Sequence, residues 1–267
     1  MDSTRKIIEY WYKKLSFDSK YDDDFYCALK EIEIPAESSV DNFVYDENNG
    51  AKNFLSFLYF CENLKNEYAN KGIDEAILYD TLSDIPIWLD TWSAIKGTMF
   101  LGETDWLKRH LGMKLIKLGR LQFCMAGAEH AIPDMNIKEN DNVMEIHIPA
   151  VGALKTQECL SSIEKAKSFF KEYFPEYEYK CFTCHSWLLD TSLNEILSQE
   201  SNIIKFQKLF DIKQQDKSDA ILKYVFKWNV SREDIDTLEC TSSFSRKIKD
   251  RIQSGGHFYE SLGTIDK

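Results

Sequence analysis

Glycine and proline are scarce in this chain, with 11 and 5 residues among 267. That scarcity excludes a collagen-like or low-complexity scaffold. No apolar run approaches the roughly 18 residues that a membrane-spanning helix needs. Positive charge is in deficit as well, because 33 Lys and Arg residues face 44 Asp and Glu residues and leave a net charge of -11. Such a surface repels nucleic-acid phosphates and anionic lipid, so we predict neither nucleic acid nor membrane as a partner.

Signals for export are also missing. No apolar segment follows the polar start of the chain at residues 1–6, so we expect no secretory signal and a cytoplasmic location. The seven cysteines are odd in number and scattered, and several lie in apolar runs such as 57–61. We therefore predict free thiols in a reducing compartment.

The apolar spacing divides the chain into two parts. Residues 1–112 show helical spacing, with a break predicted at Pro86, and residues 113–267 mix strand and helix patterns. We predict an α+β protein with a helical domain over 1–112 and a sheet domain with flanking helices over 113–267. In the second domain the pattern predicts strands at 115–125, 143–149, 177–189, 221–228 and 258–265, the last at an edge. It predicts helices there at 156–173, 192–197, 202–210 and 244–253.

A bend of small residues leaves the strand at 143–149 and enters the helix at 156–173. Ala150, Gly152 and Ala153 permit close approach, and a helix N-terminus behind such a bend presents backbone N–H groups to an anion. We predict an anion site here that would suit a pyrophosphate. The alternative, an ordinary strand–helix connection that binds nothing, stays open on the pattern alone.

A polar cluster marks the strand at 177–189. The Cys181-x-x-Cys184-His185 spacing matches a haem attachment motif, but that chemistry needs export. A metal site is also disfavoured, because Cys184 and His185 point to opposite faces of a strand, so we predict no metal. His185 is then either a histidine hydrogen-bonded to Asp190 or to a carbonyl, or a pocket histidine that titrates near neutral pH.

The neighbours of two other histidines indicate where each side chain lies. His147 shares a strand face with Glu145, and it faces the same site as His185 if the two strands are adjacent. His110 follows Lys108 in a basic cluster, so we expect it on the solvated face of a helix.

Several segments together resemble a bacterial acyltransferase family. They are Leu118-Gly-Arg-Leu-Gln-Phe123, Met144-Glu-Ile-His-Ile-Pro-Ala-Val-Gly152 and Cys184-His-Ser-Trp-Leu-Leu-Asp190. Members of that family join a helical N-terminal acyltransferase domain to a GNAT-like C-terminal domain. The resemblance implies a mixed sheet in which two central strands splay apart and acyl-CoA, or acetyl-CoA, lies in the opening.

The resemblance also implies site residues. The superfamily's phosphate loop falls on residues 147–152, with Ala150 where a glycine is usual, and the cofactor-binding backbone is that of Ile148, Ala150, Val151, Gly152 and Ala153. The superfamily's later helix motif falls on 202–209. Leu209 or Phe210 stands at its tyrosine, the usual general acid, and Tyr224 is a candidate substitute.

The predicted reaction is direct transfer of the acyl group to a small-molecule acceptor, an amine, within a ternary complex. His185, oriented by Asp190, is the first candidate for the general base and His147 the second. Trp187 and Ser186 line the substrate pocket. A ping-pong route through Cys184 is less favoured, because His185 points away from the thiol.

Two rival hypotheses remain. One is a catalytically degenerate GNAT-like module that binds a ligand or a partner and regulates, which the departures at Ala150 and Leu209 favour. The other is a hydrolase that uses Cys184 or Ser186 as its nucleophile. It is disfavoured because neither residue lies in a Gly-x-Ser-x-Gly elbow.

Overall fold

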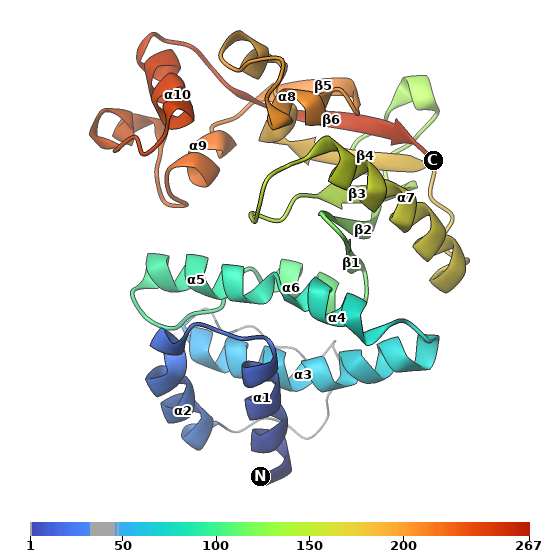
Figure 1. The fold of residues 1–267 in the computed structure, drawn as a ribbon, viewed down its shortest axis with the longest axis vertical. Helices are drawn as coiled ribbons and strands as arrows, with labels where there is room; N and C mark the ends of the chain where they lie inside the picture. Colours follow the sequence, from blue (N-terminus) through green and yellow to red (C-terminus); the bar gives the residue numbers. More distant parts are fainter. Residues whose placement is uncertain (1, 33–45, 47) are drawn as a thin grey trace. The chain divides into compact units, whose positions relative to one another are not determined.

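A computed structural model describes residues 2–32, 46 and 48–267 and divides into two compact units, Met1–Leu118 and Gly119–Lys267 (Figure 1). The first unit is helical apart from one short strand. Its elements are α1 (Asp2–Lys14), α2 (Asp22–Glu31), α3 (Gly50–Lys71), α4 (Glu75–Leu82), α5 (Ile85–Lys96), α6 (Thr104–Leu111) and β1 (Leu115–Leu118).

The helices of the first unit begin and end where local chemistry dictates. The Asn49 side chain accepts a hydrogen bond from the Lys52 N–H at the start of α3, and Gly72 ends that helix in the left-handed conformation with φ 71°. Pro86 lies in the first turn of α5, where no intrahelical N–H is needed, so the predicted break is confirmed. Trp11 and Phe54 are fully buried in the core of this unit.

The expectation that His110 lies on a solvated helix face is wrong. The side chain is fully buried, with Nδ1 3.0 Å from the Trp106 carbonyl oxygen and Nε2 3.5 Å from Asp84 Oδ2. That Asp84 oxygen also accepts hydrogen bonds from the indoles of Trp88 at 2.8 Å and Trp106 at 2.9 Å. Helical periodicity decided the outcome, because His110 lies three residues after the buried Leu107 and faces inward with it.

The second unit holds a mixed sheet with helices around it. Its strands lie in the order β2-β3-β4-β6-β5; β3 and β4 are parallel, and the other pairs are antiparallel. The predicted α+β class is thereby confirmed. The bounds are β2 (Leu121–Gly127), β3 (Asn142–His147), α7 (Thr156–Tyr173), β4 (Cys181–Ser186), α8 (Asn202–Gln207), β5 (Asp211–Lys217), α9 (Ala220–Val225), α10 (Ser243–Gln253) and β6 (Tyr259–Asp266).

Two predicted strands differ from the structure, and one strand of the structure was not predicted. Residues 221–225 of the predicted strand at 221–228 lie in helix α9, because Ile221, Leu222 and Val225 pack into the apolar cluster formed with α8 and α10. The strand predicted at 258–265 is β6, which lies between β4 and β5 and not at an edge. The edge strand is β5, whose mostly exposed polar residues carry no apolar alternation.

Two smaller corrections concern local geometry. The segment 115–125 is two strands, separated at Gly119 with φ 81°. The helix predicted at 192–197 is a short 3-10 helix over Thr191–Glu195. Among the described residues no helix combines the length and apolarity that crossing a bilayer requires.

Candidate active site

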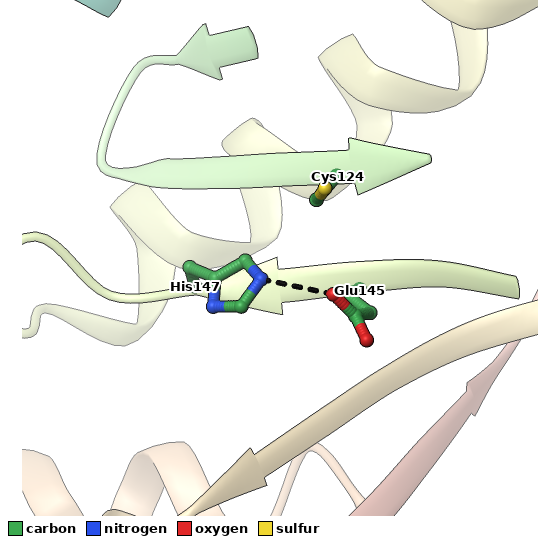
Figure 2. A group of neighbouring side chains, drawn as sticks. All are labelled: Cys124, Glu145 and His147. Atoms are coloured by element: carbon green, nitrogen blue, oxygen red, sulfur yellow. Dashed lines mark hydrogen bonds and ion pairs between the residues drawn. The ribbon is translucent and has the colours of Figure 1, made fainter. Parts of the chain in front are cut away.

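The parallel strands β3 and β4 pair over a short stretch. Their register joins Met144 to Phe182 and Glu145 to Thr183, whereas β3 continues to His147 and β4 to Ser186. Beyond the last pair, the facing edges of the two strands therefore have no ladder hydrogen bonds to each other. Figure 2 shows the strand in the colour of β4 diverging from β3 toward the His147 end. The sheet is thus open where both strands end.

Polar side chains share one face of the sheet at this opening. Glu145 lies opposite Cys124 on β2 and opposite Thr183 on β4, and residues two apart on a strand point to the same face. His147 therefore joins Glu145, and His185 joins Thr183. The two histidines singled out from the sequence occupy the same face of adjacent strands.

His147 and Glu145 form a hydrogen-bonded pair. His147 Nε2 lies 3.2 Å from Glu145 Oε2, and the two side chains are 30% and 16% exposed (Figure 2). With the proton on Nε2 donated to the carboxylate, the imidazole carries its lone pair on Nδ1. The carboxylate thus holds the ring in one tautomer, which is the arrangement that a general base requires.

The bend after β3 exposes its backbone. Ala150, Val151, Gly152 and Ala153 are all exposed, and none of their N–H groups has a hydrogen-bond acceptor in the part of the chain that the structure describes. Gly152 has φ 68° and open space where a Cβ would stand. α7 begins at Thr156 without a side-chain cap from Lys155, so its first N–H groups add to the same electropositive region.

Arg120 donates hydrogen bonds to the carbonyl oxygens of the bend. Its guanidinium donates to the carbonyl oxygens of Ala153 at 3.0 Å, Pro149 at 3.2 Å and Gly152 at 3.4 Å. Desolvation lowers the pKa of this guanidinium from its ordinary value, yet arginine remains charged at neutral pH. Sequence reasoning missed this role, although Arg120 stands in the Leu118–Phe123 segment that carries the family resemblance.

Asp190 does not orient His185 in the structure. Its carboxylate accepts from the Ser192 N–H at 2.8 Å and from the Tyr259 N–H at 2.9 Å. Burial raises the pKa of this carboxyl, against the hydrogen bonds from Ser192 and Tyr259. His185 is exposed on β4 and has no hydrogen bond to Asp190 among the described residues. The chain turns away after Ser186 into a 3-10 helix over Trp187–Leu189, which separates the two residues.

Ser186, Trp187 and Cys184, the other residues predicted near the site, differ in their contacts. Ser186 Oγ accepts from the Leu188 N–H at 3.1 Å and so caps that short helix. The Trp187 ring stacks with those of Tyr224 and Phe244, with centroids 6.0 Å and 6.3 Å from its own. Cys184 is buried on the opposite face from His185, and burial with the nearby Glu145 charge raises the pKa of its thiol far above the ordinary value. A neutral buried thiol is a poor nucleophile, which disfavours the ping-pong route.

The open parallel pair and the exposed amide bend are features of an acyltransferase of the GNAT-like type. Family comparison agrees: a family model described as GNAT-like C-terminal domain matches residues 115–265, and one described as N-acyltransferase N-terminal domain matches residues 14–113. The chain belongs to this two-domain N-acyltransferase family, as the resemblance implied. A comparison with curated proteins gives no match.

Solved structures with the same fold include three acyltransferase complexes. One holds decanoyl-CoA and is 24% identical, with a TM-score of 0.72 over 97% of this chain and 76% of that chain. A second holds decanoyl-CoA and teicoplanin, at 21% identity and a TM-score of 0.72 over 99% and 85%. A third, a mutant with octanoyl-CoA, matches at 21% identity and a TM-score of 0.73 over 99% and 85%.

Proposed function

We propose that this protein transfers an acyl group from an acyl-CoA thioester to an amine of a small-molecule acceptor, by direct attack in a ternary complex. The observation that carries the proposal is the bend over 150–153, whose N–H groups have no acceptor among the described residues and stand beside the open end of the β3–β4 pair. A diphosphate is the part of coenzyme A that such amides and the α7 N-terminus would bind.

The donor extends along the opening between the strands. Backbone groups on the facing edges of β3 and β4 beyond Glu145 and Thr183 would bind the amide-containing arm of coenzyme A and polarise the thioester carbonyl. The stacked rings of Trp187, Tyr224 and Phe244 offer apolar surface to an acyl chain. Because the solved acyltransferases hold decanoyl-CoA or octanoyl-CoA, we propose medium-chain donors ahead of acetyl-CoA.

His147 is the general base that the geometry favours. Glu145 holds Nε2, so Nδ1 takes the proton of the acceptor amine as its nitrogen attacks the thioester carbonyl. The C–N bond forms, the C–S bond breaks, and coenzyme A leaves as a thiolate that takes a proton from solvent. His185, first in order from the sequence, keeps a position on the same face but has no carboxylate partner among the described residues.

Binding and turnover test the proposal separately. Calorimetry with octanoyl-CoA and decanoyl-CoA measures binding, and release of free thiol in the presence of a panel of primary amines measures transfer. Gly152→Ala forces a side chain into the left-handed region and should weaken acyl-CoA binding about fivefold or more. Gly255→Ala is the matched control, because Gly255 has φ 84° and equally open surroundings outside the site. If Gly152→Ala and Gly255→Ala bound acyl-CoA equally well, the proposed role of the bend in binding would be contradicted.

A catalytically degenerate binding module is the second candidate function. It is favoured by Ala150 in the loop and by the residues of α8, which ends at Gln207 and is followed by Leu209 where the superfamily has its tyrosine. Tyr224, the candidate substitute acid, is 52% exposed and stacks on Trp187. Acyl-CoA binding without thiol release across the amine panel would select this second function.

A further inference from the structure

Cys124, Glu145 and His147 bring three different ligand atoms together. The thiol sulfur, a carboxylate oxygen and a ring nitrogen all lie within 4.8 Å of one another (Figure 2). They come from the paired strands β2 and β3, where Cys124 lies opposite Glu145 and His147 stands two residues further along the same face. None of the three belongs to the Cys181, Cys184 and His185 set that the strand geometry disfavours as a metal site.

The ligand chemistry selects zinc. Thiolate sulfur, imidazole nitrogen and carboxylate oxygen are the three ligand types that Zn²⁺ accepts in proteins. A tetrahedral zinc ion with usual bond lengths separates its ligand atoms by about 3.3 to 3.6 Å. The Glu145 Oε2 to His147 Nε2 distance of 3.2 Å is already close to this value. The remaining separations, at most 4.8 Å, close with side-chain shifts of about 1 Å.

A buried amide beside the cluster lacks an acceptor for its N–H groups within the residues that the structure describes. Gln122 lies opposite His147 on β2, is 1% exposed, and has an Nε2 without a hydrogen-bond partner within the described chain. A buried N–H donor without a hydrogen bond costs about 1 to 3 kcal/mol, so such a group usually has an acceptor, which can be a bound molecule. A metal-bound water, or Gln122 Oε1 after rotation of the amide, would supply the fourth position around a cation.

We propose that Cys124, Glu145 and His147 form a zinc-binding site, and that occupancy of this site inhibits acyl transfer. Binding converts the Cys124 thiol to a thiolate and releases its proton to solvent, while the imidazole binds as the neutral ring. An imidazole with zinc on one nitrogen and a proton on the other has no lone pair left to accept a proton. The inhibitory half rests on the proposed role of His147 as general base; the binding half does not.

Metal binding is tested directly on the full chain. Titration with Co²⁺ should give a thiolate-to-metal charge-transfer band in the near ultraviolet that saturates at one equivalent and disappears on addition of Zn²⁺. Cys124→Ser should abolish the band, and His147→Gln should weaken Co²⁺ binding at least tenfold while leaving the thiol in place. A denaturation curve for each variant confirms that it folds.

Another cysteine variant serves as the control for the Co²⁺ band. Cys27→Ser removes an exposed thiol outside the cluster and should leave both the band and its stoichiometry unchanged. An unchanged band in Cys124→Ser, or its loss in Cys27→Ser, would show adventitious binding to another thiol and overturn the site.

Activity separates this proposal from the proposed function. With a measurable thiol-release rate, micromolar Zn²⁺ should inhibit the natural protein at least tenfold, and Cys124→Ser should retain its rate and lose that sensitivity. Equal inhibition of both proteins would overturn the inhibitory half. A protein that gives the Co²⁺ band but releases no thiol with any amine would leave the zinc site standing and remove the acyltransferase proposal instead.

Discussion

One polar site in the first unit and one in the second differ in what their polar groups contact. In the first unit, the Asp84 carboxylate lies against two indole N–H groups and His110, all contributed by the same unit. In the second unit, the amides of the bend over 150–153 and the buried Nε2 of Gln122 have no partner among the described residues. A polar group that is hydrogen-bonded within its own unit contributes to stability, and one without such a partner is available to a ligand. The predictions below test that division.

The largest effect is expected at the open site. His147→Ala should lower kcat about a hundredfold or more, because the proposed base is removed. His185→Ala should lower kcat by less than about tenfold, since His185 lies on the same face without the carboxylate partner. Thiol release at saturating acyl-CoA measures both. A larger loss of kcat in His185→Ala than in His147→Ala would identify His185, the first candidate from the sequence, as the general base.

Asp84→Asn should destabilise the first unit by about 2 to 3 kcal/mol, because it removes the buried carboxylate that accepts hydrogen bonds from the indoles of Trp88 and Trp106. Burial by itself would raise the pKa of Asp84, but the hydrogen bonds and charge of His110, with the two indoles, lower it to about 2. A depressed folded-state pKa means that this contribution is present above about pH 4 and is lost as the pH falls toward about 2.

Urea denaturation followed by tryptophan fluorescence measures this stability at several pH values. Asp80→Asn is the control, because Asp80 is exposed on the neighbouring helix α4 and should change the free energy of unfolding by less than about 0.5 kcal/mol. If Asp84→Asn kept full stability and full acid sensitivity, the buried Asp84 carboxylate would not stabilise this unit.

Arg120→Met should weaken acyl-CoA binding about tenfold, because three carbonyl oxygens of the bend lose the donor that orients them and the site loses a charge. Calorimetry with octanoyl-CoA gives the dissociation constant. Arg246→Met removes an exposed arginine of α10 and should leave that constant unchanged. If Arg246→Met weakened acyl-CoA binding as much, the effect would come from the change in net charge and not from the bend.

Glu145→Gln should have the smallest effect, lowering kcat about fivefold with the KM for acyl-CoA unchanged, since the carboxylate positions His147 and does not touch the donor phosphates. Glu145→Asp should recover part of the rate. Glu139→Gln, at an exposed position before β3, is the control. A raised KM with unchanged kcat would place Glu145 in donor binding instead.

Much of the fold could be predicted from local patterns. The alternation in 143–149 predicted β3, and the amphipathic spacing in 156–173 predicted α7. The strand β5 was missed because an exposed edge strand needs no apolar alternation, and 221–228 was assigned to a strand because a short apolar run fits either structure. The basic neighbours of His110 favour a solvated position, whereas helical periodicity turns it inward with Leu107.

Local patterns were enough to indicate an acidic, thiol-bearing α+β chain and to predict an anion site at the bend over 150–153, because composition, period and small-residue bends are local properties. The acyltransferase class came from the resemblance of three segments to a known family. The spacing of Glu145 and His147 already placed them on one strand face, whereas the partners of Asp190 and the approach of Cys124 to Glu145 were decided by tertiary structure. Asp190 is near His185 in sequence but bonds Ser192 and Tyr259, whereas Glu145 reaches His147 and meets Cys124 across a strand pair. Strand register brings such groups together over distances that no local pattern encodes.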